Sequence, residues 1–148
     1  MNPSNQTITD LFVAARDGKS FYEQAASKVT DSELKPLFTR LAKVKGGIVQ
    51  SLTGEIRADE AKSPEPGSWS SDLNKVYSDV RNHLGEKNYG YVAKLEESEG
   101  RLLKAFERVQ DDDATPAPVR SALGEYLPEM RKCHDILESR KMSLKHAA

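Results

Sequence analysis

Charged side chains fall on the apolar stripes of this sequence, at positions that would point into a helical core. Lys19 and Lys45 each lie three and four residues from apolar neighbours, and Glu99 falls on a third stripe. One interpretation is a mid-bundle cluster in which lysine ammonium groups replace a metal ion as the counter-charge. Tyr126 falls near the same level and would either hydrogen-bond Glu99 or belong to the core. The alternative, which we favour because lysine is seldom fully buried, is that both lysines extend outward to surface carboxylates.

The ligands for a metal centre inside such a bundle are missing from the sequence. A di-iron bundle needs a glutamate from each of two helices and a Glu-x-x-His motif from each of the other two. No Glu-x-x-His motif occurs here, and Glu129 and His134 are five residues apart, on different faces of a helix. The residual metal candidates are Glu96 and Glu99, which are neighbours on one helix face, and His134. Solvated acidic faces and partly exposed histidines are commoner than metal sites, so we predict no metal and no other cofactor.

Other catalytic patterns are also missing. The sequence has no phosphate-binding glycine loop and no nucleophile elbow. Cys133 faces the core, where it is expected to be a small apolar filler rather than a reactive thiol. We therefore predict no catalytic residue and favour a protein that is not an enzyme.

The elements that must position these residues are helices, because apolar residues recur at spacings of three and four almost throughout. Pro64, Pro66 and Gly67 indicate a loop over residues 58–70, and Pro128 is expected to kink the last helix. A short helix is predicted in the connection, over Asp72–Leu84. The long helices are predicted at Thr7–Lys28, Ser32–Arg57, Lys87–Gln110 and Pro116–Met142.

The connection between the second and third long helices indicates how the helices are joined. It is too long for a simple turn, and its loop portion alone, fully extended, would span roughly the length of the bundle. This favours a long crossover, as in ferritin-like bundles, over an up-down-up-down arrangement. The fold class predicted is therefore all-α, a ferritin-like four-helix bundle with a long crossover that contains a short extra helix.

Several short segments resemble an uncharacterised bacterial family of ferritin-like four-helix-bundle proteins, known only as a domain of unknown function. The resemblance extends from about Thr9 to Met142 and implies a ferritin-like fold and a bacterial origin, but no established reaction. The family tends to have an acidic residue at the position of Lys19, so this chain departs where a ligand would be needed. The matching segments are Ala15 to Gly18, Asp31 to Arg40, Glu96 with Glu99, and Arg131 to Asp135 around His134.

Length and composition exclude several classes of protein. The 148 residues suggest one domain, residues 1–148, with its core over about 7–142. With 22 basic and 23 acidic residues there is no positive surface for nucleic acid. No apolar run is long enough to span a membrane, and no basic region followed by an apolar one predicts a signal peptide. The single cysteine excludes an internal disulfide and suits the cytoplasm.

These observations favour a non-enzymatic cytoplasmic bundle with a structural or protein-interaction role, stress-related by family analogy alone. The alternative is a metal-binding ferritin-like oxidoreductase or iron-handling protein with a degenerate site. A homodimer is also predicted, because Val13, Phe21 and Val49 fall off the core stripes. With Gly46 and Gly47 they would form an exposed apolar strip suited to a second copy of the chain.

Overall fold

Helices make up almost all of the described part of the computed structural model, which covers residues 5–56, 69–86 and 89–147. No strand occurs in these ranges, so the predicted all-α class is confirmed. None of the described helices has the length and hydropathy needed to cross a lipid bilayer. The helices are α1 (Asn5–Lys28), α2 (Leu34–Leu52), α3 (Trp69–Arg81), α4 (Tyr89–Asp111) and α5 (Ala117–Ala147), with a 3-10 turn, η1 (Thr53–Glu55), after α2.

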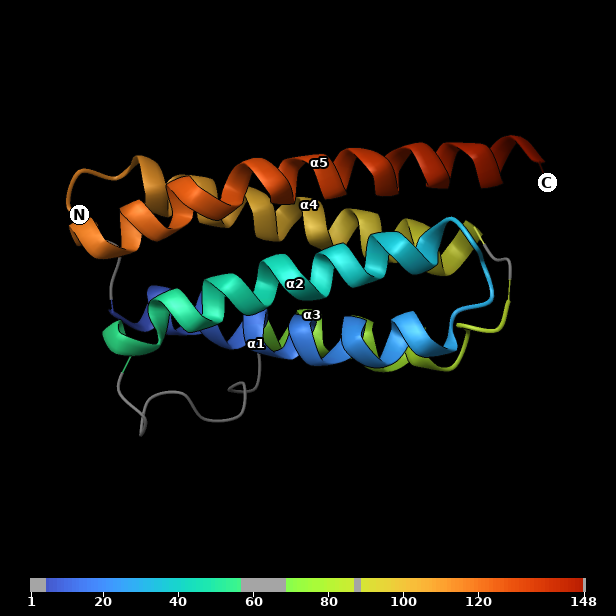
Figure 1. Cartoon of the computed structure of the whole chain (residues 1–148), viewed down its shortest axis with the longest axis horizontal. Helices are drawn as coiled ribbons and strands as arrows, with labels where there is room; N and C mark the ends of the chain where they lie inside the picture. The colour runs from blue at the N-terminus through green and yellow to red at the C-terminus, as the bar shows by residue number, and fades with distance from the viewer. Residues whose placement is uncertain (1–4, 57–68, 87–88, 148) are drawn as a thin grey trace.

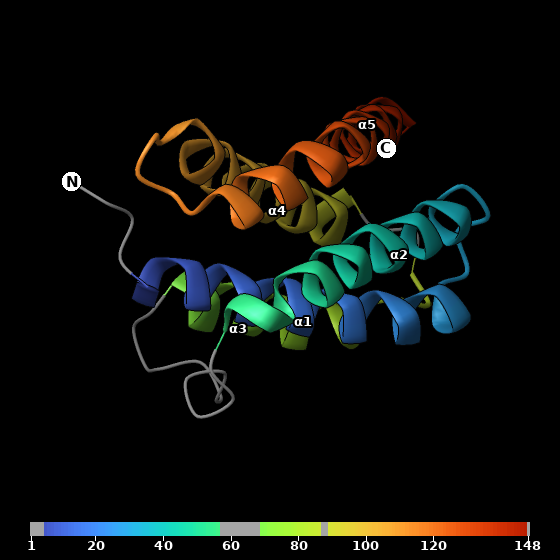
Figure 2. The ribbon, with the colours of Figure 1, turned by 60° about the vertical axis from the view of Figure 1, so that its left-hand side comes forward.

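The four long helices pack side by side, and the short α3 fills a position beside two of them. α1 packs along α2, α2 along α5, and α5 along α4, while α3 lies between α1 and α4. The colours in Figure 1 run in the same direction along α2 and α4 and in the opposite direction along α1, α3 and α5. The connection from α2 to α4 therefore returns along the bundle through α3. Figure 2 shows α4 and α5 on one side of the bundle and α1 and α3 on the other.

The ends of several helices differ from the sequence prediction. α2 stops at Leu52 rather than Arg57, and Arg57 lies outside the described residues. Residues 58–68 of the predicted loop likewise lie outside them, and Trp69 already belongs to α3. α5 continues through Pro128 without a break and extends to Ala147, beyond its predicted end at Met142. Its last turns are held because Leu144 packs partly against the core.

The apolar strip predicted for a dimer interface is covered by the protein itself. Phe21 and Val13 are buried, with 0% and 4% of their surface exposed, and Val49 packs partly against the core. The Phe21 ring stacks on Tyr77 of α3, with the ring centroids 4.6 Å apart. The prediction assumed that each helix buries a single apolar stripe. This assumption was wrong for α1, which packs against α2 on one side and α3 on the other. The dimer stays a prediction, but this strip cannot form its interface.

The turn between α1 and α2 is fixed by one buried carboxylate. Asp31 accepts hydrogen bonds from the backbone N–H groups of Glu33 and Leu34, at 2.9 and 3.3 Å, and so caps the start of α2. It also accepts two from the Arg140 guanidinium, at 3.0 and 2.7 Å, which ties α5 to this turn. Burial raises the pKa of Asp31, but the hydrogen bonds from Arg140 and Glu33 outweigh burial and lower it.

The lowered pKa of Asp31 predicts a specific loss of stability in acid. Asp31→Asn is expected to lower the free energy of unfolding by about 1 kcal/mol at pH 7, because the pair with Arg140 is lost while the cap is kept. A carboxyl with a lowered folded-state pKa stabilises the fold above its unfolded pKa, about 3.9, and loses this effect as pH falls through the folded value. The difference between wild type and variant, measured by urea unfolding, should therefore shrink between pH 5 and pH 3.

The control for this prediction is Glu33→Gln. Glu33 also contacts Arg140, at 3.0 Å, but its side chain is 68% exposed, so the substitution should change stability by less than about 0.5 kcal/mol. An Asp31→Asn variant that keeps its full deficit at pH 3 would contradict the assignment of the acid-sensitive group.

Candidate functional site: a buried Lys–Glu–Tyr cluster

Four helices each contribute one polar side chain to a cluster in the middle of the bundle: Tyr22 from α1, Lys45 from α2, Tyr77 from α3 and Glu99 from α4. The Lys45 ammonium lies 2.7 Å from Oε1 of Glu99. The hydroxyls of Tyr22 and Tyr77 both donate to Oε2 of Glu99, at 2.6 and 2.8 Å. The Glu99 carboxylate is thus the acceptor that joins the four helices.

The cluster is closed to solvent. The side chain of Lys45 is 0% exposed and that of Glu99 is 3% exposed, and both tyrosines are buried. A single charge at this depth would be costly, so the ammonium and the carboxylate are each tolerated because the other is present. The Lys45 nitrogen also lies 5.9 Å from the centre of the Tyr22 ring, within the range of a cation–π contact.

Neither tyrosine nor the nearby cysteine is poised to react. Burial raises the pKa of Tyr22 and Tyr77 well above 10, and the adjacent Glu99 charge raises both further. Both hydroxyls therefore keep their protons and act as hydrogen-bond donors. Burial also raises the pKa of the Cys133 thiol to about 11, so this side chain stays a neutral apolar filler as the sequence predicted.

Gly18 makes the space that the cluster occupies. A Cβ atom at Gly18 would lie 2.7 Å from Cδ of Lys45 and 2.8 Å from the Tyr77 hydroxyl oxygen, both too close for real contacts. Glycine lowers helix propensity by about 1 kcal/mol relative to alanine, so its presence inside α1 needs a packing reason. The close approach of Lys45 and Tyr77 supplies that reason.

The four residues singled out from the sequence do not all meet. Lys45 and Glu99 form the buried pair, against the expectation that both lysines extend outward. Lys19 does extend outward: its side chain is 44% exposed and pairs with Glu23 at 3.2 Å. Tyr126 is half-buried, and its ring lies against Gly47, where a Cβ would come within 2.4 Å of it. Lys19 and Tyr126 therefore stand outside the cluster.

The sequence did not single out Tyr22 and Tyr77, which donate hydrogen bonds to Glu99. The available signal was the hydroxyl itself, because a buried tyrosine usually finds a hydrogen-bond partner. Which acceptor it finds depends on how α1, α3 and α4 pack, and no local spacing in the sequence carries that information.

The weaker metal candidates separate into two groups. Glu99 points into the cluster, whereas Glu96 lies between α4 and α5 and meets His134, with Nε2 of His134 2.9 Å from Oε2 of Glu96. Lys141 pairs with the other oxygen of Glu96. Burial raises the pKa of Glu96, but the hydrogen bonds from Lys141 and His134 outweigh burial and lower it. Glu96 and Glu99 therefore do not share a ligand site, although they are close in sequence.

The interior does not fit the di-iron centre that a ferritin-like fold implies. Such a centre uses four carboxylates and two histidines that point inward. Among the described residues, Asp31 and Glu99 are the buried carboxylates, and Asp31 caps α2 at the end of the bundle. The remaining carboxylate, Glu99, already carries the Lys45 ammonium 2.7 Å away, where it would repel a cation. The cluster is therefore suited to holding helices together rather than to binding a metal.

Comparison with known proteins identifies one family. Residues 5–112 match the model of a domain of unknown function, DUF2383. No curated protein and no solved structure matches the chain significantly. The match includes all four cluster residues and ends just before α5.

Proposed function

This chain belongs to the DUF2383 family, a domain of unknown function, and from that premise we propose that it is a non-enzymatic protein of ferritin-like four-helix-bundle fold with a structural or protein-interaction role. The observation that carries this proposal is the Lys45–Glu99 pair at 2.7 Å in the bundle centre. A lysine at this place supplies the positive charge that a metal ion supplies in a di-iron bundle, and it does so without any redox chemistry.

The ferritin-like part of the proposal is supported by the directions of the long helices. α2 and α4 run the same way and are joined by a long connection that contains α3, an arrangement typical of bundles with a crossover (Figure 1). A bacterial origin is proposed from the family resemblance.

The proposed location is the cytoplasm, where thiols stay reduced. Cys133 is the sole cysteine of the chain and is buried, so it can neither form an internal disulfide nor readily form one with another molecule. The stress-related role is proposed by analogy with the family and rests on no residue of the cluster.

The test of this proposal is metal content and iron oxidation measured on the same preparations. Wild type and Glu99→Gln are expressed with added iron and manganese, purified with a chelator and analysed for metal. Ferrous iron is then added in air, and the ferric product is followed by its absorbance in the near ultraviolet. We expect less than one tenth of an equivalent of either metal per chain and oxidation no faster than in buffer.

The outcome that would contradict the proposal is one tightly held iron or manganese ion per chain that is lost in Glu99→Gln. Iron oxidation that exceeds the buffer rate in wild type and falls to it in Glu99→Gln would also contradict it and would favour the metal-binding oxidoreductase. Glu97→Gln is the matched control, because Glu97 lies on the exposed face of the same helix.

A further inference from the structure

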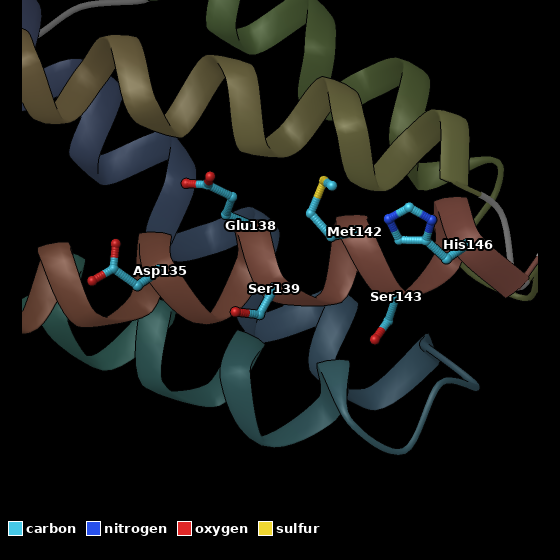
Figure 3. Close-up of a pocket in the computed structure, with 6 residues that line it drawn as sticks. All are labelled: Asp135, Glu138, Ser139, Met142, Ser143 and His146. Atoms are coloured by element: carbon cyan, nitrogen blue, oxygen red, sulfur yellow. The ribbon is translucent and has the colours of Figure 1, made fainter.

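Three potential metal ligands lie together on the surface of α5, away from the buried cluster. A ring nitrogen of His134 and one carboxylate oxygen each from Asp135 and Glu138 all lie within 4.8 Å of one another. His134 and Glu138 are four residues apart, so they share one face of the helix. Figure 3 shows Asp135 and Glu138 extending from α5 at the rim of a pocket. We propose that these three side chains form a binding site for a divalent transition-metal ion of the zinc class.

The orientation of the His134 ring supports this assignment, because it is fixed from the neighbouring helix. Nε2 of His134 lies 2.9 Å from Oε2 of Glu96 on α4, and Lys141 holds the other oxygen of that carboxylate. Metal-ligating histidines almost always donate their second ring N–H to a carboxylate or carbonyl, which selects the tautomer and raises the basicity of the ligand nitrogen. In the neutral tautomer in which Nε2 donates its proton to Glu96, Nδ1 carries the free lone pair.

Gly100 is a second, independent observation that the fold determines where the His134 ring lies. A Cβ at Gly100 would lie 3.0 Å from Nε2 of His134 and 3.7 Å from Oε2 of Glu96. α4 therefore has a glycine in its interior at the point where the histidine ring lies against it. The His134 side chain is only 19% exposed, so its rotamer is restricted before any ion arrives.

The two carboxylates are free to close around an ion. Neither Asp135 nor Glu138 forms a hydrogen bond or ion pair with another residue in the described part of the chain, and both are exposed. Zinc ligands lie about 2.0–2.2 Å from the ion, so tetrahedral ligand atoms are about 3.4 Å apart. The ligand atoms, all within 4.8 Å of one another, would have to approach by at most about 1.4 Å to reach this spacing.

The donor set favours zinc and its neighbours over magnesium or calcium. An imidazole nitrogen suits zinc, copper, nickel and iron, whereas magnesium and calcium prefer sites made of oxygen. Three protein ligands leave a fourth position for water. His146, also at the rim of this pocket (Figure 3), lies eight residues beyond Glu138, or about 12 Å along the helix, and so belongs to no shared site.

The proposal is tested by titrating zinc chloride into the metal-free full chain in a calorimeter. We expect one ion per chain, an affinity at least tenfold lower in His134→Ala and in Glu138→Gln, and no change in His146→Ala. Magnesium chloride should give no measurable heat. Glu96→Gln tests the positioning role: it keeps the three ligands and should weaken zinc binding 10- to 100-fold.

Circular dichroism of each variant shows whether it folds. If His134→Ala loses helicity, comparing the zinc affinities of Glu138→Gln and His146→Ala still tests the proposal. Equal zinc affinity in wild type and Glu138→Gln, or no binding at millimolar zinc, would overturn the proposal. Zinc binding that survives in Glu99→Gln and disappears in Glu138→Gln supports this site and leaves the proposed function untouched, because the buried cluster takes no part in it.

Discussion

Replacing Lys45 by methionine is expected to lower the free energy of unfolding by about 3–5 kcal/mol, the cost of breaking a buried ion pair by removing one partner. Methionine is also unbranched, is one heavy atom shorter than lysine and fills most of the same space, so the loss arises chiefly from the charge. Glu99 would keep its two tyrosine donors but lose the ammonium 2.7 Å from Oε1. The measurement is urea unfolding at pH 7, followed by circular dichroism.

The matched control is Lys19→Met, at a lysine on the surface of α1. Its side chain is 44% exposed and pairs with Glu23, so the same substitution should change stability by no more than about 0.5 kcal/mol. The double variant Lys45→Met/Glu99→Leu should recover most of the loss, because replacing both members of a buried pair by apolar residues is often neutral or stabilising. Equal losses in Lys45→Met and Lys19→Met would show that the pair is not buried in solution.

The helices themselves were predictable because each one buries a stripe that local spacing reveals. The repeat of apolar residues located the five α-helices of the described residues, and the long connection predicted between the second and third long helices anticipated the return along the bundle. The ends were less predictable. α2 begins two residues after the predicted Ser32, at a cap formed by the nearby Asp31, whereas the long end of α5 depends on Lys141 and Glu96, which are far apart in the sequence.

Of the four cluster residues, the sequence indicated Lys45 and Glu99 as candidates but not Tyr22 and Tyr77, and the reason is geometric. Lys19 and Lys45 occupy equivalent places on their stripes, but only Lys45 meets a buried carboxylate, whereas Lys19 pairs with the exposed Glu23. The difference comes from Gly18, which leaves room for the Lys45 stem and for the Tyr77 hydroxyl, and from α3, which brings Tyr77 to the site. The local spacing of residues does not indicate which helices α3 packs against. Because the packing of α3 on α1 was not predicted, Phe21 was expected on the surface.

The cluster also explains how α3 is held in place. α3 packs against α1 and α4, and its Tyr77 contacts both: the ring stacks on Phe21, and the hydroxyl donates to Glu99. The stacking contributes apolar burial, and the hydrogen bond fixes the rotation of α3 about its own axis. One carboxylate thus joins α3 to α1, α2 and α4.

Tyr22→Phe is expected to lower the free energy of unfolding by about 1.5–3 kcal/mol, the range for a hydrogen bond to a charged group. Phenylalanine keeps the ring and its edge contact with Tyr77, so no large cavity forms. The loss arises because Oε2 of Glu99 gives up its 2.6 Å donor at a depth where water cannot replace it. Urea unfolding at pH 7 measures the effect.

Tyr126→Phe is the control for the loss of a hydroxyl as such. Tyr126 is half-buried, and its hydroxyl has no hydrogen-bond partner within the described ranges, so this substitution should change stability by less than about 0.5 kcal/mol. The double variant Tyr22→Phe/Tyr77→Phe should lose more than the sum of the two single variants, because it removes both tyrosine donors to one buried oxygen. Strict additivity, or a Tyr22→Phe variant as stable as Tyr126→Phe, would mean that the two hydroxyls do not share Glu99, and the cluster would then reduce to the Lys45–Glu99 pair alone.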